Sequence, residues 1–240
     1  MITINWYPIT QNEKDIDCLI NFESNIVYID PEPAFPYFLK KYPESTFTRC
    51  PAFSQYLKNT FIICSPYDLQ LTFDKDKKEI YTDRFGQEFF INNLNITPCE
   101  NDPWVVHLPP RFVLVTEQKS PVMVVVLPLM IEENSFSVVP GTFDITKWIR
   151  PIEFAFQVRD LDKPIQLKRG QPLMMIKFVT ENDEPVQLER SILTKEVFQA
   201  AYACINVKAV MPNKNLQALY KMANPFITKI KQSIFNGRNK

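Results

Sequence analysis

The sequence predicts a mainly β protein, with a β-sandwich or jelly-roll-like body, an irregular N-terminal arm and a helical C-terminus. Three observations lead to this prediction. Short runs alternate apolar and polar residues at period two, which is typical of strands with one buried face. These runs follow one another without helical segments between them. The chain has 20 Pro and only 4 Gly, so proline-containing loops rather than tight glycine turns separate the runs.

Residues 1–50 are expected to form the irregular arm. Their most distinctive stretch, residues 30–39, reads Asp-Pro-Glu-Pro-Ala-Phe-Pro-Tyr-Phe-Leu. Prolines at this density remove backbone donors and interrupt both helices and strands. We therefore predict an extended, aromatic segment that wraps on the core without regular structure of its own.

Residues 51–190 are expected to form the sandwich body. Alternation is clearest at residues 69–73 and in Ile152–Val158, where every second residue is apolar or aromatic. Val122–Leu127 is apolar throughout, which indicates a central strand buried on both faces. Other candidate strands lie at residues 59–64, 79–82, 88–91, 111–115, 135–139, 165–168, 173–179 and 186–189, and one more lies at residues 25–29 within the expected arm.

Residues 191–240 are expected to form a helical, basic C-terminal segment. Thr194 can cap a helix that runs to about residue 206. Apolar residues recur at helical spacing from 215 to 235, and Pro225 is expected to kink or break this second helix. No acidic residue follows Glu196, so the tail carries seven positive charges. Because the whole chain is neutral, residues 1–196 carry a net charge of −7.

Three surfaces could accept this basic tail: the acidic body of the same chain, an anionic membrane surface or nucleic acid. Docking on the body is our prediction, because it removes the apolar stripe from water without requiring a partner. A peripheral membrane contact through the basic helix is the second alternative. Nucleic acid is third, since the charges are spread and form no specific motif. We expect residues 215–223 to pack on the body and the segment after Pro225 to project.

The single histidine, His107, argues against the common imidazole-rich metal sites, so we expect no metal and no cofactor. A facial iron triad needs two histidines and a carboxylate, and catalytic zinc sites need histidines or close cysteines. The five cysteines are widely spaced and form no C-x-x-C pair. The G-x-S-x-G, P-loop and G-x-G-x-x-G motifs are also missing from the sequence. We therefore expect a structural role for His107 and no catalysis of these common types.

The cysteines and the apolar segments also indicate a compartment. An odd number of scattered cysteines is unlike a secreted disulfide scaffold. The first residues lack a basic region followed by an apolar run, so no signal peptide is expected. The longest apolar stretch, residues 121–131, is too short to span a bilayer. We expect a soluble cytoplasmic protein without a transmembrane segment.

The predicted ligand site consists of Asp144, Trp148 and Arg150, which follow a Pro-Gly turn at the end of the expected sheet. An aromatic ring beside a guanidinium is a common recognition pair for small molecules and peptides. The structural alternative is that Trp148 fills the end of the sandwich while Arg150 binds loop carbonyls. Both interpretations are open at the level of the sequence.

Two resemblances involve this part of the chain. The first rests on Pro140-Gly141-Thr142-Phe143-Asp144-Ile145, Lys147-Trp148, Arg150-Pro151, Phe154-Ala155-Phe156, Lys168-Arg169-Gly170 and Pro172-Leu173. In these residues the chain resembles a family of uncharacterised β-rich proteins of tailed phages that infect marine bacteria. The resemblance implies a phage origin and no assigned activity.

The second resemblance is to the trimeric dUTPase and dCTP deaminase group. It rests on the relative places of Gly141, Asp144, Pro164, Ile165 and Gly170. It implies a nucleotide-like ligand. The chain departs from that group at Trp148 and Pro151, where the nucleoside-binding loop has Tyr and Gly, and at Met175, where Gln is usual.

The functional prediction is a non-enzymatic phage protein that binds a protein partner of the host or of the virion. One alternative is a nucleotide-like small-molecule binder or enzyme of dUTPase-like form. The other is a structural component of the virion, which a proline-rich arm and a tail helix would suit. The expected location is the host cytoplasm, or the virion in the last case.

Overall fold

The computed structural model describes residues 1–9, 28–76, 79–82, 95–97, 104–130 and 135–236. Within these residues the fold is mainly β with a pair of C-terminal helices, which confirms the predicted fold class. The predicted strands of residues 51–190 fall on observed ones, apart from residues 88–91, which lie outside the described residues. Of the strand predicted at residues 25–29, residues 25–27 also lie outside the described residues, and residues 28 and 29 belong to no strand. The jelly-roll topology stays a prediction.

The N-terminal strand lies inside sheet A, with a paired strand on each side. The strand order of this sheet is β14-β1-β7-β11-β9, and β6 pairs with β7 beside this path. All its pairs are antiparallel except that between β1 and β14, which is parallel. The strands are β1 (Ile2–Ile9), β6 (Asn95–Thr97), β7 (Val105–Thr116), β9 (Phe136–Val138), β11 (Ile152–Val158) and β14 (Val186–Arg190).

Sheets B and C complete the β structure. Sheet B has the order β10-β8-β13-β3-β2, and sheet C has the order β12-β4-β5. The strands of sheet B are β2 (Glu32–Pro33), β3 (Thr60–Cys64), β8 (Val122–Leu127), β10 (Gly141–Asp144) and β13 (Pro172–Thr180). Those of sheet C are β4 (Leu69–Asp74), β5 (Glu79–Thr82) and β12 (Ile165–Leu167).

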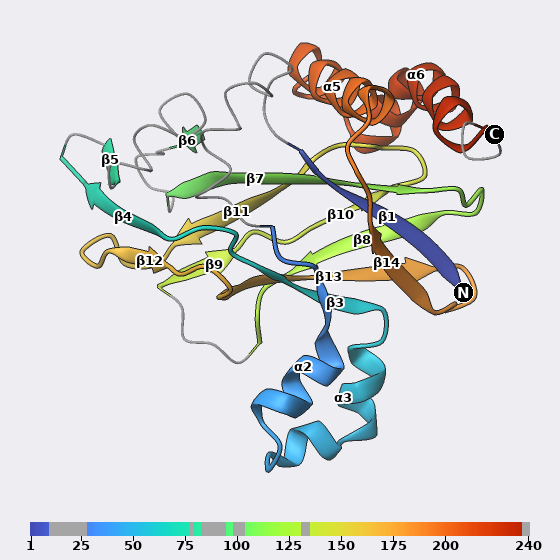
Figure 1. Cartoon of the computed structure of the whole chain (residues 1–240). Coiled ribbons are helices and arrows are strands. Elements are labelled where there is room, and N and C mark those ends of the chain that lie inside the picture. The colour runs from blue at the N-terminus through green and yellow to red at the C-terminus, as the bar shows by residue number, and fades with distance from the viewer. Residues whose placement is uncertain (10–27, 77–78, 83–94, 98–103, 131–134, 237–240) are drawn as a thin grey trace.

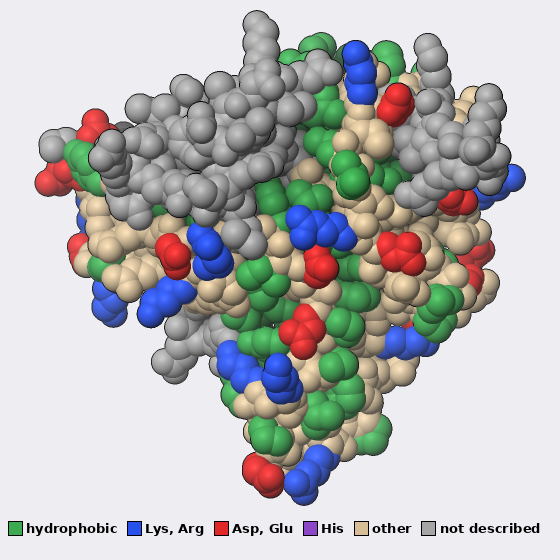
Figure 2. Space-filling view, viewed as in Figure 1, with side chains coloured by type: hydrophobic (Ala, Val, Ile, Leu, Met, Phe, Trp, Pro, Cys, Tyr) green, Lys and Arg blue, Asp and Glu red, His purple; other side chains and the backbone are tan. Residues whose placement is uncertain are grey.

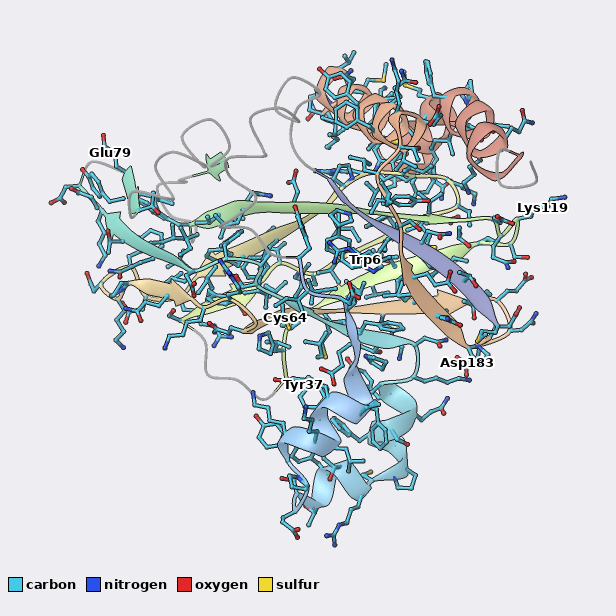
Figure 3. All side chains as sticks on the ribbon, viewed as in Figure 1. Trp6, Tyr37, Cys64, Glu79, Lys119 and Asp183 are labelled. Atoms are coloured by element: carbon cyan, nitrogen blue, oxygen red, sulfur yellow. The ribbon has the colours of Figure 1, made fainter. Side chains whose placement is uncertain are left out.

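One hydrophobic core joins the three sheets. It contains Trp6 from β1, which is labelled in Figure 3, Phe154 and Phe156 from β11, and Ile176 from β13. Successive strand residues point to opposite faces, so every second side chain of sheets A and B enters this core. β8 lies between β10 and β13 as a central strand, but its second face is only half-buried. The prediction of burial on both faces of β8 was therefore wrong for that face.

Helices cover the outer faces of sheets A and B, so that two helical layers enclose these two sheets (Figure 1). The helical layer formed by α5 (Lys195–Val210) and α6 (Leu216–Asn236) packs on Tyr7, Val113 and Val115 of sheet A. On sheet B, α2 (Ala34–Lys41), η1 (Thr46–Arg49) and α3 (Pro51–Tyr56) form a smaller helical layer. Its Phe38 is buried with Ile62 and Met175. Side chains that point away from the main core therefore form two further cores.

The prediction of an irregular N-terminal arm was wrong for the residues of this segment that the structure describes. Ile2–Ile9 is a central strand, and its period-two pattern of apolar residues is the signal that was missed. Ala34–Lys41 is a helix despite Pro36. Proline is tolerated there because the first turn of a helix has no intrahelical partners for its N–H groups. Residues 10–27 lie outside the described residues.

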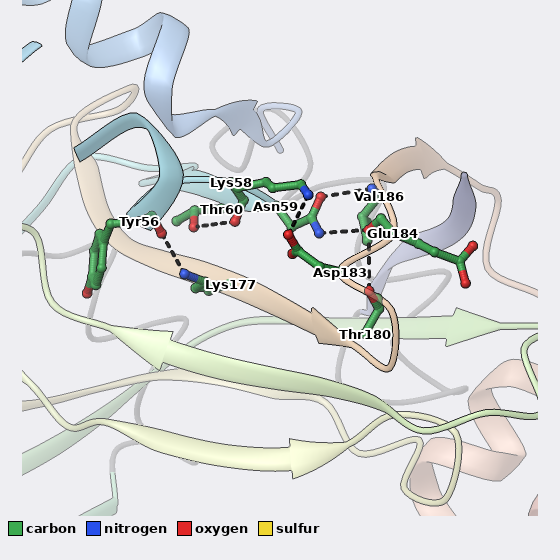
Figure 4. A network of polar contacts seen from close by, with 9 residues as sticks. All are labelled: Tyr56, Lys58, Asn59, Thr60, Lys177, Thr180, Asp183, Glu184 and Val186. Carbon is green, nitrogen blue, oxygen red and sulfur yellow. Dashed lines mark hydrogen bonds and ion pairs between the residues drawn. The ribbon is translucent and has the colours of Figure 1, made fainter. Parts of the chain in front are cut away.

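A polar network fixes the start of β3 against the turn between β13 and β14 (Figure 4). The Asn59 side chain donates to the carbonyl of Glu184 at 2.8 Å and accepts from the amide of Val186 at 2.9 Å. Asn59 has a φ of 56°, and Asp183, which pairs with Lys58, has a φ of 52°. Both residues adopt the left-handed conformation that Asn and Asp tolerate better than other non-glycine residues.

Candidate functional site

The loop between β10 and β11 carries the three residues predicted to bind a ligand, and Asp144 organises it. Asp144 Oδ1 accepts hydrogen bonds from the Thr146 amide at 2.9 Å and from the Thr146 hydroxyl at 2.6 Å. Its other oxygen lies 3.0 Å from Lys147 Nζ. The carboxylate of Asp144 therefore caps its own loop, as Asp often does in turns.

The pKa of Asp144 reflects these contacts. Burial acts to raise the pKa, but hydrogen bonds from Thr146 and Lys147 favour the charged form and lower the pKa overall. A carboxylate that stays ionised at neutral pH cannot serve as a general acid there. Asp144 therefore acts as a structural anion in the loop.

Helix α6 occupies the space above this loop. The Asp144 amide donates to the Tyr220 hydroxyl at 2.8 Å, and Lys231 Nζ donates to the Thr146 carbonyl at 3.0 Å. Burial lowers the pKa of Lys231, and the charge of Asp144 opposes this effect. The rings of Trp148 and Tyr220 lie with their centroids 6.0 Å apart. The predicted ligand site thus holds the chain's own C-terminal helix.

Trp148 and Arg150 have different surroundings. Trp148 is 2% exposed and belongs to the core under α5 and α6. Its ring fills the junction of sheet and helices, in line with the structural alternative. Arg150 lies outside that core, with its side chain 40% exposed and one guanidinium nitrogen 3.9 Å from Glu153 Oε2. Ligand binding by Arg150 stays a prediction, but Asp144 and Trp148 do not share a surface with it.

Glu153 brings Arg150 close to the single histidine. Its Oε2 also lies 3.6 Å from His107 Nδ1. The pairing of β11 with β7 shifts register between Ile152 and Phe154, so Glu153 sits at an irregularity of the strand. This group was missed at the sequence level because the contact of His107 with Glu153 depends on the pairing of two distant strands.

Cys204 of α5 is not a reactive thiol. Burial raises its pKa to about 12, against weaker opposing effects of the Ile149 backbone and Arg150. The thiolate is the nucleophilic form, so Cys204 acts as a core residue. In the parts of the chain that the structure describes, no group of three or more His, Cys, Asp or Glu side chains is arranged to hold a metal ion.

The outer side of the α5–α6 layer carries exposed apolar side chains. Its apolar members with high exposure include Val210 at 76% and Phe226 at 53%. We use the name helical-layer surface for a set of exposed residues of α5, α6 and the turn between them: Tyr202, Val210, Lys214, Leu216, Lys221, Met222 and Phe226. At the top of the view, where this layer lies, Figure 2 shows hydrophobic side chains with basic and acidic ones beside them. Exposed apolar side chains that gather in one region mark interaction sites more often than scattered ones do.

Neither α5 nor α6 is apolar enough over a sufficient length to cross a bilayer, and the same holds for the other described helices. Comparisons with protein-family models, with curated proteins and with solved structures found no match to the chain.

Proposed function

We propose that this protein is a non-enzymatic interaction protein that binds a partner protein through the helical-layer surface. The observation that carries the proposal is the exposure of Val210, Leu216 and Phe226 on a layer whose opposite side is fully packed. Burial of exposed apolar residues of this size against a partner removes them from water, which makes binding more favourable. The buried roles of Asp144, Trp148 and Cys204 supply no competing catalytic group.

A protein partner fits this surface better than a bilayer does. Helices that lie in a membrane interface insert their most apolar face. In α6 that face consists of Leu219, Ala223 and Ile227, and all three are buried against sheet A. The residues left outside are a mixture of apolar, amide and lysine side chains, which is typical of a protein interface with a polar rim.

Affinity purification from the native host tests this proposal with a matched pair of variants. In the surface variant, Val210, Leu216 and Phe226 are each changed to Ser. In the control variant, Leu39 and Tyr56, which are comparably exposed on the smaller helical layer, are changed to Ser. We expect wild type and control to retain the same protein and the surface variant to lose it. Equal retention by all three chains would contradict the proposal.

We also propose that the chain is a tailed-phage protein that acts in the host cytoplasm, which the resemblance of residues 140–173 supports. The alternative of a virion component has a direct test. Mass spectrometry of purified virions would find the chain in stoichiometric amount if it is structural. Its absence from virions, together with its presence in infected cells, would favour the cytoplasmic role.

A further inference from the structure

We infer that the partner presents an acidic protein segment with apolar side chains to the helical-layer surface. This inference rests on the proposed function and specifies the chemistry of the partner. It follows from three properties of the surface: its charge, its exposed apolar side chains and the packing of the faces beneath it.

The charge of the surface has one sign. No acidic residue follows Glu196 in the sequence, so α6 and most of α5 contribute only positive groups. Two lysines are engaged within the chain: Lys208 donates to the Pro212 carbonyl at 2.7 Å and Lys231 to Thr146. Among the described contacts, Lys214 and Lys221 are exposed and form no ion pair. A partner with carboxylates would complement them, which gives specificity and a faster association rate.

The exposed apolar side chains belong to the same two helices and connecting turn as these lysines. Val210 and Leu216 stand on either side of the α5–α6 turn, and Lys214 lies between them in sequence. Tyr202 on α5 is 53% exposed and stacks on Phe198 with a ring distance of 6.1 Å, which restrains it. Restrained aromatic side chains bind at low entropic cost and are enriched among the residues that dominate interface energies. A purely polar acidic chain would leave these residues in water.

Nucleic acid and lipid suit the surface less well. Phosphate backbones are bound by clustered cations, and here two lysines already bind carbonyl groups. The apolar side chains of Leu216, Met222 and Phe226 have no counterpart on a phosphate backbone. Insertion into a bilayer would require α6 to leave sheet A, because Ile227 is only 2% exposed.

Binding of defined probes to the full-length protein tests the inference. The probes are a peptide with Glu and Leu at helical spacing, the same peptide with Gln for Glu, phosphatidylserine-containing vesicles and single-stranded DNA. We expect the Glu/Leu peptide to bind best, the Gln form to bind at least about tenfold more weakly, and added salt to reduce the difference. Tighter binding of vesicles or DNA, or equal binding of both peptides, would overturn the inference.

Variants locate the binding. The double variant Lys214→Glu and Lys221→Glu should bind the Glu/Leu peptide more weakly. The variant Phe226→Ser should bind both peptides more weakly. The control variant Lys40→Glu and Lys168→Glu changes exposed sites on α2 and beside β13, and it should bind both peptides as wild type does. If no probe binds but the affinity purification still depends on Val210, Leu216 and Phe226, the inference of an acidic partner is wrong and the proposed function stands. If the purification also shows no dependence, both are wrong.

Discussion

Asp144 and Trp148 show which part of a site can be predicted from residue types. The sequence placed both residues on a loop, and Trp148 does lie in the loop between β10 and β11, whereas Asp144 is the last residue of β10, a strand that was not predicted. Their burial depends on Tyr220, which follows Asp144 by 76 positions and bonds to its amide. A local pattern does not contain a contact of that range. The sequence therefore indicated the loop but not the helix that covers it.

Acidification should reveal the anionic role of Asp144. Its pKa is lowered in the folded state, so its contribution to the free energy of unfolding is present above the unfolded-state pKa, ordinarily 3.8. That contribution is lost as the pH falls through the folded-state value. We expect Asp144→Asn to be less stable than wild type at neutral pH, with a difference that shrinks below about pH 4. Urea unfolding from neutral pH to below pH 4 measures the free energy of unfolding of wild type and of Asp144→Asn. The control is Asp76→Asn, at an exposed site. A difference that does not change with pH would contradict the prediction.

Asn59 offers a second test, because its backbone and its side chain are both constrained. Asn59→Ala removes the bonds to Glu184 and Val186 and places a Cβ without a polar group at positive φ. We expect it to lower the free energy of unfolding by about 3 kcal/mol. Asn59→Gly loses the same bonds but accepts the backbone conformation, so it should cost up to about 1 kcal/mol less.

Chemical denaturation measures both changes at Asn59, and Asn213→Ala in the exposed α5–α6 turn serves as the reference. If Ala and Gly had equal effects, the positive φ of Asn59 would carry no energetic weight.

Among the elements, α6 departs most from its predicted form. A kink or break was expected at Pro225, and the break does not occur, because the helix runs through this residue. Pro225 lies on the exposed side, as does Lys221, whose carbonyl loses its intrahelical donor and can bind water instead. Ala223 and Ile227 are buried on either side of the proline and hold both halves on sheet A. The prediction that the segment after Pro225 projects was therefore wrong up to Lys231.

Two neighbouring residues of α6 should respond very differently to truncation. Ile227→Ala removes a buried side chain from the core under the helical layer and should cost about 3 kcal/mol. Phe226→Ala changes a side chain that is 53% exposed and should cost less than about 1 kcal/mol. Urea unfolding of the two variants makes the comparison. Similar losses of unfolding free energy in the two variants would mean that α6 is rotated from the described orientation. A negligible loss for Ile227→Ala would support the prediction that the segment after Pro225 projects.

On the scale of the whole molecule, the strands could be located from the sequence but their order could not. Runs of strand character between turn signals located most described strands of the body, and period two was clear in β4 and β11 because it reflects burial of one face. β6 and β10 were missed. The parallel pairing of β1 with β14 joins residues that lie more than 180 positions apart, such as Ile2 and Val186. Only the assembled sheet determines such a pairing, so the N-terminal residues were assigned to an arm. In the same way, the division at residue 50 separated β1 and β2 from the sheets to which they belong.

Removal of residues 2–9 distinguishes a central strand from an arm. β1 pairs with β14 on one side and with β7 on the other, so its loss leaves buried N–H and C=O groups of both neighbours without partners. The deletion also removes Ile4 and Trp6 from the main core, and Tyr7 from the core under α5 and α6. We expect the shortened chain to lack a cooperative unfolding transition and dispersed amide resonances. Exposed Thr3→Ala, as a control on the same strand, should unfold within about 1 kcal/mol of wild type. A shortened chain that still unfolds cooperatively near the wild-type midpoint would show that sheet A forms without β1, as an arm would allow.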